Sequence, residues 1–350
     1  MNKFAPLLTL FLAILLIVAV PDGLAQEKPG KVVCIAFYNL ENLFDTIDSP
    51  DTDDKEFLPS APGQWNSQKY YTKLQHLAEV INRIGAEESK NGPLFAGLSE
   101  VENRNVVEDL VKTPPLSSRG YSFIHYESPD ARGIDVAFIY QPRFFKVLES
   151  KTIAFKIPDN PGFRSRDVLL VHGLMDKEHL YILITHWPSR SGGLKVTAPL
   201  RIAAADLCRA TTDSIRKINP SARILIMGDL NDDPVDESLM GHLKTATSIE
   251  NVSDSVLFNP MWLLFKDGEG TLAYKNAWNL FDQIIVSGTL VNTLKPGYRF
   301  FKAGVYKNDF IIQKDGQYAG YPLRTYGGKT YLGGYSDHFP VYMLLVRSKK

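Results

Sequence analysis

The 350-residue sequence contains only two cysteines, Cys34 and Cys208, which are too few for a fold that depends on a disulfide framework. Cys34 falls in an apolar run typical of a strand, and Cys208 falls in an amphipathic run typical of a helix. Both positions favour buried free thiols. A single bridge between the two cysteines is left open by the sequence.

The chain also lacks an excess of charge of either sign, since 39 Lys and Arg residues balance 39 Asp and Glu residues. Tight nucleic-acid binders usually carry a basic field. The balance therefore argues against a tight DNA-binding protein, but an enzyme that meets nucleic acid transiently is compatible with it. Internal repeats, low-complexity tracts and Pro/Gly linkers are absent as well, so we expect one compact domain and a monomer.

Long apolar runs are absent except near the N-terminus, where Lys3 precedes the almost wholly apolar residues 7–20. A small-residue site, Gly23-Leu24-Ala25, follows this run. The pattern is typical of a signal peptide over residues 1–25, and the apolar run is short for a helix that spans a membrane. We therefore expect residues 26–350 to form a single exported domain, periplasmic or extracellular, without stable membrane insertion.

An acidic segment at residues 45–54 lacks the spacing and the central glycine of an EF-hand calcium loop, so we expect a solvated loop there. Two segments rich in aromatic residues, 261–265 and 296–335, have two interpretations. Their rings could stack on bases or sugars, or they could pack beneath long loops. Residues 261–265 are also the only candidate for a hydrophobic hairpin that contacts a membrane, and the segment is too short to support that interpretation.

Apolar periodicity and capping residues predict three helices. The first begins at Asn66 or Ser67 and ends at Gly85, where a left-handed cap is expected. Asn103 can cap the second helix, and Pro199 suits the N1 position of the third.

The stretch that organises the rest of the chain is residues 223–231. Its apolar core runs into Gly228 without alternation, which is typical of a strand buried on both faces. Asp229 and Asn231 then stand two residues apart, so extended backbone places the carboxylate and the amide on one side. Gly228 permits a turn or a close approach. The alternative interpretation is a strand followed by an ordinary capped turn.

Polar residues also end or begin other apolar, strand-like runs, namely Asn39, Glu100, His186, Asp282, Asp337 and His338. Each has a structural explanation when it is taken alone. Glu100 could favour the positive end of the following helix, and His186 could be an ordinary loop histidine. A layered sheet could instead bring all of these side chains to one edge.

Such a set suits phosphoryl transfer. Mg²⁺ prefers oxygen ligands, for which Glu100 is the best candidate, with Asn39 and Asp337 beside it; Mn²⁺ or Ca²⁺ would also be compatible. Asp229 and Asn231 could deprotonate and align a water molecule for in-line attack.

Histidines supply the remaining chemistry. His186 and His338 could stabilise charge that develops on the phosphate and on the leaving oxygen. Asp282 could orient an imidazole and raise its pKa.

The order of these motifs resembles the endonuclease/exonuclease/phosphatase superfamily, the fold of deoxyribonuclease I. The matching pieces span nearly the whole mature chain: Tyr38-Asn39-Leu40-Glu41-Asn42, Glu100 after its strand, Thr185-His186, Gly228-Asp229-Leu230-Asn231, Phe281-Asp282-Gln283-Ile284-Ile285-Val286 and Ser336-Asp337-His338.

The resemblance implies an α/β fold, a four-layer α/β sandwich in which two mainly antiparallel sheets pack face to face with helices outside. It also implies divalent-metal-dependent hydrolysis of a phosphoester. By the motif match, Glu100 is the principal metal ligand, assisted by Asn39 and Asp337. The catalytic residues are His186, Asp229, Asn231, Asp282 and His338, with Asp282 orienting His338.

Two further residues are expected to contact the substrate. Family members often have a further tyrosine or acidic residue between the glutamate and the first histidine. Asp135 is assigned to this position, for which Arg132 and Tyr140 are the competing candidates. Arg190 is a candidate phosphate contact because of its residue type and its place in a Gly-rich loop after His186.

Within the superfamily, loops rather than the shared site decide the substrate. The primary hypothesis is an exported endonuclease, a phosphodiesterase acting on DNA or RNA. The alternative is a phosphatase or phospholipase C type enzyme acting on a sugar phosphate, an inositol phosphate or sphingomyelin. A catalytically silent binding module is the third hypothesis, and loss of the motif residues would have indicated it.

Overall fold

The structure is a computed structural model that describes residues 29–250 and 252–348. The expected signal peptide over residues 1–25 lies outside the described residues. Among the residues described, none of the helices is both long enough and apolar enough to cross a membrane.

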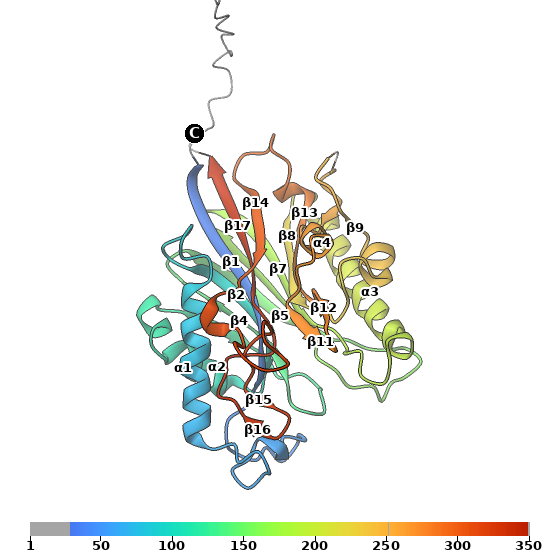
Figure 1. Cartoon of the computed structure of the whole chain (residues 1–350). Coiled ribbons are helices and arrows are strands. Elements are labelled where there is room, and N and C mark those ends of the chain that lie inside the picture. The colour runs from blue at the N-terminus through green and yellow to red at the C-terminus, as the bar shows by residue number, and fades with distance from the viewer. Residues whose placement is uncertain (1–28, 251, 349–350) are drawn as a thin grey trace, which may run out of the picture.

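Two large sheets form the centre of the molecule (Figure 1). The first sheet contains, in spatial order, β14 (Tyr298–Val305), β17 (Val341–Ser348), β1 (Pro29–Leu43), β2 (Pro93–Val101), β4 (Asp135–Tyr140) and β3 (Ser122–His125). The second contains β5 (Phe145–Ile153), β6 (Val168–Met175), β7 (Glu178–His186), β8 (Arg223–Asp229), β13 (Asp282–Ser287), β10 (Leu257–Phe258) and β9 (Thr245–Ala246). Two small hairpins add β11 (Leu272–Tyr274) with β12 (Ala277–Asn279), and β15 (Tyr326–Gly327) with β16 (Thr330–Tyr331).

Most neighbouring strands are antiparallel, but each large sheet has a parallel pair at its centre, β1 with β2 and β7 with β8. The carboxyl ends of these four strands meet at one edge of the sandwich, where the Asn39 amide after β1 is hydrogen-bonded to Asp229 at the end of β8. Strands β17, β4 and β13 run antiparallel to them, so the N-terminal ends of these strands lie at the same edge. This topology gathers residues from distant parts of the chain.

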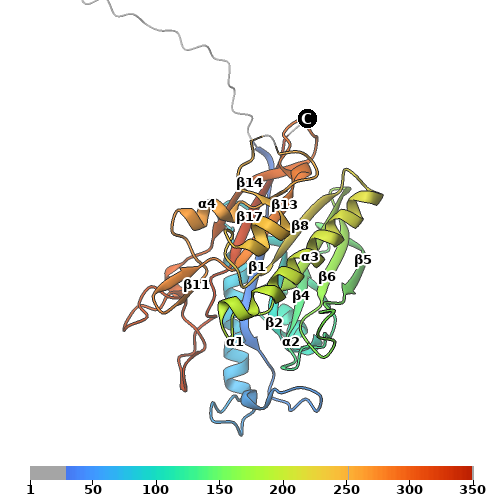
Figure 2. The same ribbon diagram turned by 90° about the vertical axis from the view of Figure 1, so that its right-hand side faces the viewer.

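Helices cover the outer faces of both sheets (Figures 1 and 2). Helices α1 (Ser67–Arg83) and α2 (Arg104–Lys112) lie on the first sheet, and α3 (Leu194–Ile218) lies on the second. A short helix, α4 (Met261–Lys266), packs near β13 and β14. The arrangement is the four-layer sandwich that the sequence predicts.

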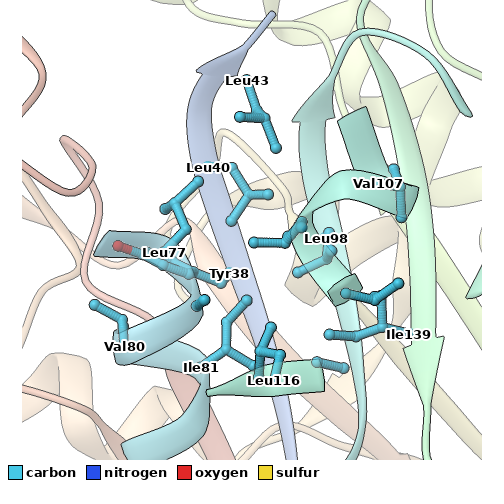
Figure 3. Close-up of a cluster of buried hydrophobic side chains, with 14 of the residues drawn as sticks. Tyr38, Leu40, Leu43, Leu77, Val80, Ile81, Leu98, Val107, Leu116 and Ile139 are labelled. Atoms are coloured by element: carbon cyan, nitrogen blue, oxygen red, sulfur yellow. The ribbon is translucent and has the colours of Figure 1, made fainter. Parts of the chain in front are cut away.

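Alternation along the strands divides the apolar residues between layers. On β1, Ile35 and Phe37 face the second sheet, whereas Ala36 and Tyr38 face the helices. Figure 3 shows the helix side of this strand, where Tyr38 and Leu40 pack with residues of α1 and α2. Strand β8 is likewise buried on both faces, as its unbroken apolar run predicts.

The predicted caps of the first two helices are confirmed. The Asn66 side chain accepts a hydrogen bond from the backbone N–H of Lys69, and Asn103 caps α2 through Asn105 and Val106. Gly85, which follows α1, has φ +60°, a value that favours glycine. Both Cys34 and Cys208 are free and buried.

One local prediction is wrong and another is only partly right. Pro199 lies inside α3 rather than at N1, because the helix already begins at Leu194, after Gly193. Residues 261–265, which are too short for a membrane hairpin, lie in helix α4, whose first residue, Met261, is buried against the core between the sheets. The acidic loop is not wholly solvated: Asp54 is buried and accepts a hydrogen bond of 2.9 Å from the backbone N–H of Ser49.

Candidate active site

The common edge of the two sheets brings the predicted polar residues together. Asn39 and Glu100 lie near the carboxyl ends of β1 and β2, and His186 pairs with Asp229 across the ends of β7 and β8. Asp282 begins β13 opposite Asp229. The cluster therefore contains residues from the parallel strands and from the antiparallel strand next to them.

Asp229 lies at the centre of this cluster. Its Oδ2 accepts a hydrogen bond of 3.0 Å from the Asn39 amide and lies 3.6 Å from Nε2 of His186 and 3.9 Å from Nε2 of His338. Its Oδ1 accepts a hydrogen bond of 3.0 Å from the backbone N–H of Asn231. One carboxylate therefore faces groups from both sheets.

Gly228 allows β7 and β8 to approach closely beside Asp229. A Cβ atom at Gly228 would lie 2.0 Å from the carbonyl oxygen of Thr185, the register partner on β7. Of the two explanations for this glycine, the structure supports close approach, because its φ is not positive. Glycine is therefore required here to keep His186 and Asp229 at adjacent positions.

Glu100 is fixed by hydrogen bonds to both of its carboxylate oxygens. The Asn39 amide donates to Oε1 at 3.2 Å, and the backbone N–H of Asn42 donates to Oε2 at 2.9 Å. Glu100 itself has φ +59°, and Asn42 has φ +51°. Non-glycine residues in this region are held against a local energetic cost, and such positions cluster at functional sites.

The amide of Asn39 is oriented as a donor toward the carboxylates. Its nitrogen serves both Glu100 and Asp229, while its oxygen accepts a hydrogen bond of 2.9 Å from the backbone N–H of Glu41. In this arrangement Asn39 positions the two carboxylates. The amide would have to flip before its oxygen could face an ion between the two carboxylates, so the role of Asn39 as a metal ligand stays a prediction.

The donor set of the site fits a hard divalent cation. Ligand atoms of Glu100, His186 and Asp229 lie within 4.8 Å of one another, and the two carboxylates share one amide group between them. Burial and the nearby carboxylates of Asp282 and Glu100 together raise the pKa of Asp229 to about 7, against the opposing effect of His338. A cation would relieve this repulsion, and carboxylate oxygens are the ligands that Mg²⁺ prefers.

The two histidines are shifted in opposite directions. Burial lowers the pKa of His186 well below its usual value, and the cations Arg166 and Arg132 lower it further. Burial also acts to lower the pKa of His338, but Asp282 and neighbouring carboxylates outweigh it and raise that pKa well above its usual value. At neutral pH the site therefore contains one neutral and one cationic imidazole.

His338 is held from two sides. Its Nδ1 lies 2.7 Å from Oδ2 of Asp282, which is fully buried. Its backbone N–H donates to the Ser336 hydroxyl, and that hydroxyl donates to the carbonyl oxygen of Asn39. The pairing leaves Nε2 of His338 facing Asp229.

Arg190 lies in an ion-pair network rather than alone in a loop. Its guanidinium lies 2.6 to 3.3 Å from carboxylate oxygens of Asp232, Asp233 and Asp236, and its Nε donates to the carbonyl oxygen of Asn231. The structure thus gives Arg190 a part in fixing the segment after Asn231. A contact with phosphate stays a prediction.

Asp135 and Asp337 also have protein partners. Asp135 is buried, lies 3.0 Å from Nε2 of His125 and accepts a hydrogen bond of 2.9 Å from the backbone N–H of Ser128. Asp337 accepts a hydrogen bond of 2.9 Å from Arg324. A substrate contact by Asp135 and a metal contact by Asp337 therefore stay predictions. Each carboxylate would have to bind its ligand in addition to the protein partner described above.

A buried ion cluster beside the site was not singled out from the sequence. Glu41 lies 3.7 Å from Nζ of Lys73 and 3.2 Å from Nε of Arg324, and it accepts a hydrogen bond of 2.7 Å from the backbone N–H of Thr325. The sequence did give a signal for Glu41, because it lies within the motif that begins at Tyr38. Lys73 gave none, because a lysine on a helix is normally solvated.

A family model described as the endonuclease/exonuclease/phosphatase family matches residues 34–347. No curated protein sequence matches the chain. Solved structures do. The chain is 16% identical to an endonuclease/exonuclease/phosphatase family protein from Bacteroides thetaiotaomicron, with a TM-score of 0.55 and coverage of 92% of this chain and 100% of that chain.

Two other solved structures share the fold. D. rerio TDP2 complexed with single strand DNA product is 16% identical, with a TM-score of 0.52 and coverage of 90% of this chain and 98% of that chain. The human Nocturnin catalytic domain with bound sulfate anion is 16% identical, with a TM-score of 0.53 and coverage of 90% and 94%, respectively. At this identity the similarity establishes a common fold.

Proposed function

The chain belongs to the endonuclease/exonuclease/phosphatase family, whose members are metal-dependent phosphoester hydrolases, and from this premise we propose that it is a phosphodiesterase that cleaves DNA or RNA. The observation that carries the proposal is the convergence of Glu100 and Asp229 with two histidines on one edge of the sandwich. The pKa of one histidine, His186, is lowered and that of the other, His338, is raised. The single strand DNA product in D. rerio TDP2 supports nucleic acid as the substrate class.

In this proposal Glu100 is the principal ligand of a divalent cation, preferably Mg²⁺, with Mn²⁺ or Ca²⁺ as substitutes. Such an ion, when bound, would stabilise negative charge on the phosphate and lower the pKa of water. Asp229 and Glu100 repel each other across the Asn39 amide. The cation therefore has an electrostatic reason to bind here.

Asp229 is the proposed base. A pKa of about 7 allows it to accept a proton from water near neutral pH. Asn231, whose backbone N–H is hydrogen-bonded to Asp229 and whose amide nitrogen donates to the carbonyl oxygen of Trp187, is fixed beside it. Asn231 thus can align the attacking water for in-line displacement at phosphorus.

The histidines act on the phosphate. Cationic His338 can pair with a nonbridging oxygen or donate a proton to the leaving oxygen, while Asp282 orients it. Neutral His186 can donate one hydrogen bond without adding charge. Its Nδ1 is buried and has no hydrogen-bond partner among the described residues, so the ring retains an unused donor or acceptor.

A substrate panel tests the proposal. Purified residues 26–350 should cleave single-stranded DNA, duplex DNA or RNA with Mg²⁺ and lose this activity in EDTA. Hydrolysis confined to a phosphomonoester would instead identify a phosphatase, and hydrolysis confined to sphingomyelin would identify a phospholipase C type enzyme. Binding of nucleic acid without turnover under every metal condition would identify a silent binding module.

We also propose export and a monomeric state. The charged start, apolar run and small-residue site of residues 1–25 support cleavage and export. N-terminal sequencing of the full chain expressed in a bacterium should find Gln26 as the first residue, in the periplasm or the medium. Retention of Met1 in the cytoplasm would contradict export, and light scattering at a dimer mass would contradict the monomer.

A further inference from the structure

A pocket of about 490 Å³ opens beside the candidate active site. Its wall combines the end of β1 with two loop regions that are distant in sequence, residues 56–65 and 324–329. A volume of this size is typical of a site for a small molecule or for one residue of a polymer. Nothing in the proposed chemistry of the phosphate uses this pocket.

Two walls of the pocket are attached directly to the active site. Asn42 lines the pocket, and its backbone N–H donates to Glu100 at 2.9 Å. Arg324 also lines it and donates a hydrogen bond of 2.9 Å to Asp337, the residue before His338. A phosphate bound between Glu100 and His338 would therefore have one of its substituents next to the pocket.

Aromatic side chains line the pocket and are held in place. Phe57 stacks on Phe44 with ring centroids 4.1 Å apart, and the indole N–H of Trp65 donates to the carbonyl oxygen of Phe44 at 3.0 Å. The Tyr326 hydroxyl donates to the carbonyl oxygen of Gly63 at 2.9 Å. Rings that are already fixed lose little conformational entropy when a planar ligand packs against them.

Charges of both signs lie at the same pocket, since Glu41, which is buried and paired with Arg324, and the exposed Glu56 line it together with two cations. Arg324 and Lys329 both line it and both are exposed, with 48% of the Arg324 side chain accessible. Fixed aromatic rings beside exposed cations are the combination by which proteins bind single-stranded nucleic acid, since the rings stack on bases and the cations attract the backbone. A simple sugar phosphate would use the cations but not the stacking surface of a base.

We infer that this pocket binds one unpaired nucleobase adjacent to the cleaved phosphate, so that the enzyme acts on single-stranded nucleic acid in preference to duplex. A base within a duplex is stacked on both neighbours and paired, and it would enter a concave pocket only after leaving the stack. The inference rests on the proposed function and adds a substrate class to it.

Abasic substitution tests the inference directly. A set of single-stranded oligonucleotides, each with one abasic nucleotide at a different position, is cleaved with Mg²⁺ and the cut positions are mapped. We expect cleavage at the bond next to the abasic nucleotide to fall by about tenfold or more, on one side only, because stacking on an aromatic ring contributes about that factor per base. The matched duplex should be cut about tenfold more slowly than the single strand.

Two pairs of variants locate the effect in the pocket. Tyr326→Leu removes a ring, whereas Tyr326→Phe keeps the ring and loses only the hydrogen bond to Gly63. The abasic effect should largely disappear in Tyr326→Leu and persist in Tyr326→Phe. Phe57→Leu provides a second test if Tyr326→Leu does not fold, and Tyr318→Leu, an exposed ring outside this pocket, is its control.

A metal-free measurement separates binding from turnover. In EDTA, quenching of tryptophan fluorescence should report binding of a nucleoside 5′-monophosphate at least about tenfold tighter than binding of ribose 5-phosphate. Tyr326→Leu should remove this difference.

The outcomes distinguish the two proposals. If no nucleic acid is cleaved at all, the proposed function fails. If single and double strands are cleaved equally, abasic positions have no effect and the two ligands bind equally, then the nuclease assignment survives and the pocket inference is overturned.

Discussion

Nδ1 of His338 lies 2.7 Å from the Asp282 carboxylate, although 56 residues separate them along the chain. The contact joins the two sheets, because Asp282 begins β13 and His338 precedes β17. It also sets the charge of the imidazole, since Asp282 is the chief group that raises the pKa of His338 against the effect of burial.

Asp282→Asn should move the pH dependence of cleavage. Removing the carboxylate lowers the pKa of His338, and the proposed role needs the protonated ring, so activity should be lost at lower pH than in the wild type. We expect the alkaline limb of the kcat/KM profile to move down by about 1 pH unit. Asp254→Asn, which alters a remote ion pair with Lys295, should leave the profile in place; an unmoved limb in Asp282→Asn would contradict the assignment.

Arg201→Met should destabilise the protein strongly. Arg201 is fully buried, and its Nε lies 2.6 Å from Asp232, which also pairs with Arg190. The variant leaves the buried Asp232 carboxylate with only the partly exposed Arg190 as its counter-charge; breaking a buried ion pair typically costs about 3 to 5 kcal/mol, and the remaining pair should place this variant toward the lower end of that range. Urea unfolding measures this loss. Arg209→Met, which breaks an ion pair with Asp213 on the surface of α3, should cost less than about 1 kcal/mol.

Gly228→Ala should separate β7 from β8 at the active site. The added methyl group would meet the Thr185 carbonyl, and such overpacking typically costs about 1 to 3 kcal/mol. Both thermal stability and activity should fall. Gly162→Ala is the matched control, because its Cβ would have only one neighbour within 4 Å, at 3.9 Å, and it should behave as the wild type.

Glu100→Gln should abolish stabilisation by the metal. In the wild type, Mg²⁺ at 100 times its dissociation constant should add about 2.7 kcal/mol to the free energy of unfolding, because only the folded protein forms the site. The variant removes the repulsion of Asp229 but turns an amide nitrogen toward one of the two donors, Asn39 or Asn42. Because these effects oppose each other, its stability in EDTA should lie within about 1 kcal/mol of the wild type. Calorimetry with and without Mg²⁺ measures both effects, and an equal response of both proteins to Mg²⁺ would remove Glu100 from the metal site.

Much of the fold could be predicted because local patterns carry it. The unbroken apolar run before Gly228 predicts a strand buried on both faces, and Asn66 and Asn103 mark helix starts through hydrogen bonds that form within a few residues. Pro199 was misleading because proline usually marks the first turn of a helix, whereas here it is the sixth residue of α3, which begins at Leu194.

Contacts between distant segments were harder to predict. The ion pair of Lys73 with Glu41 depends on how α1 packs against β1, and a lysine among polar helix residues gives no sign of burial. The three carboxylates around Arg190 were invisible for a similar reason, since the turn after Asn231 folds back on the loop after β7. The order of the motifs predicted well which residues lie together at the site. It predicted less well which groups each of these residues contacts.

The most direct test of the account is the Mg²⁺-dependent kcat/KM of Asp229→Asn on a single-stranded oligonucleotide, beside the wild type. Asn keeps the size of the side chain but cannot accept the proton of the attacking water, so the account predicts a loss of at least about a hundredfold, with thermal unfolding still cooperative. Activity within about twofold of the wild type in a folded variant would contradict the account.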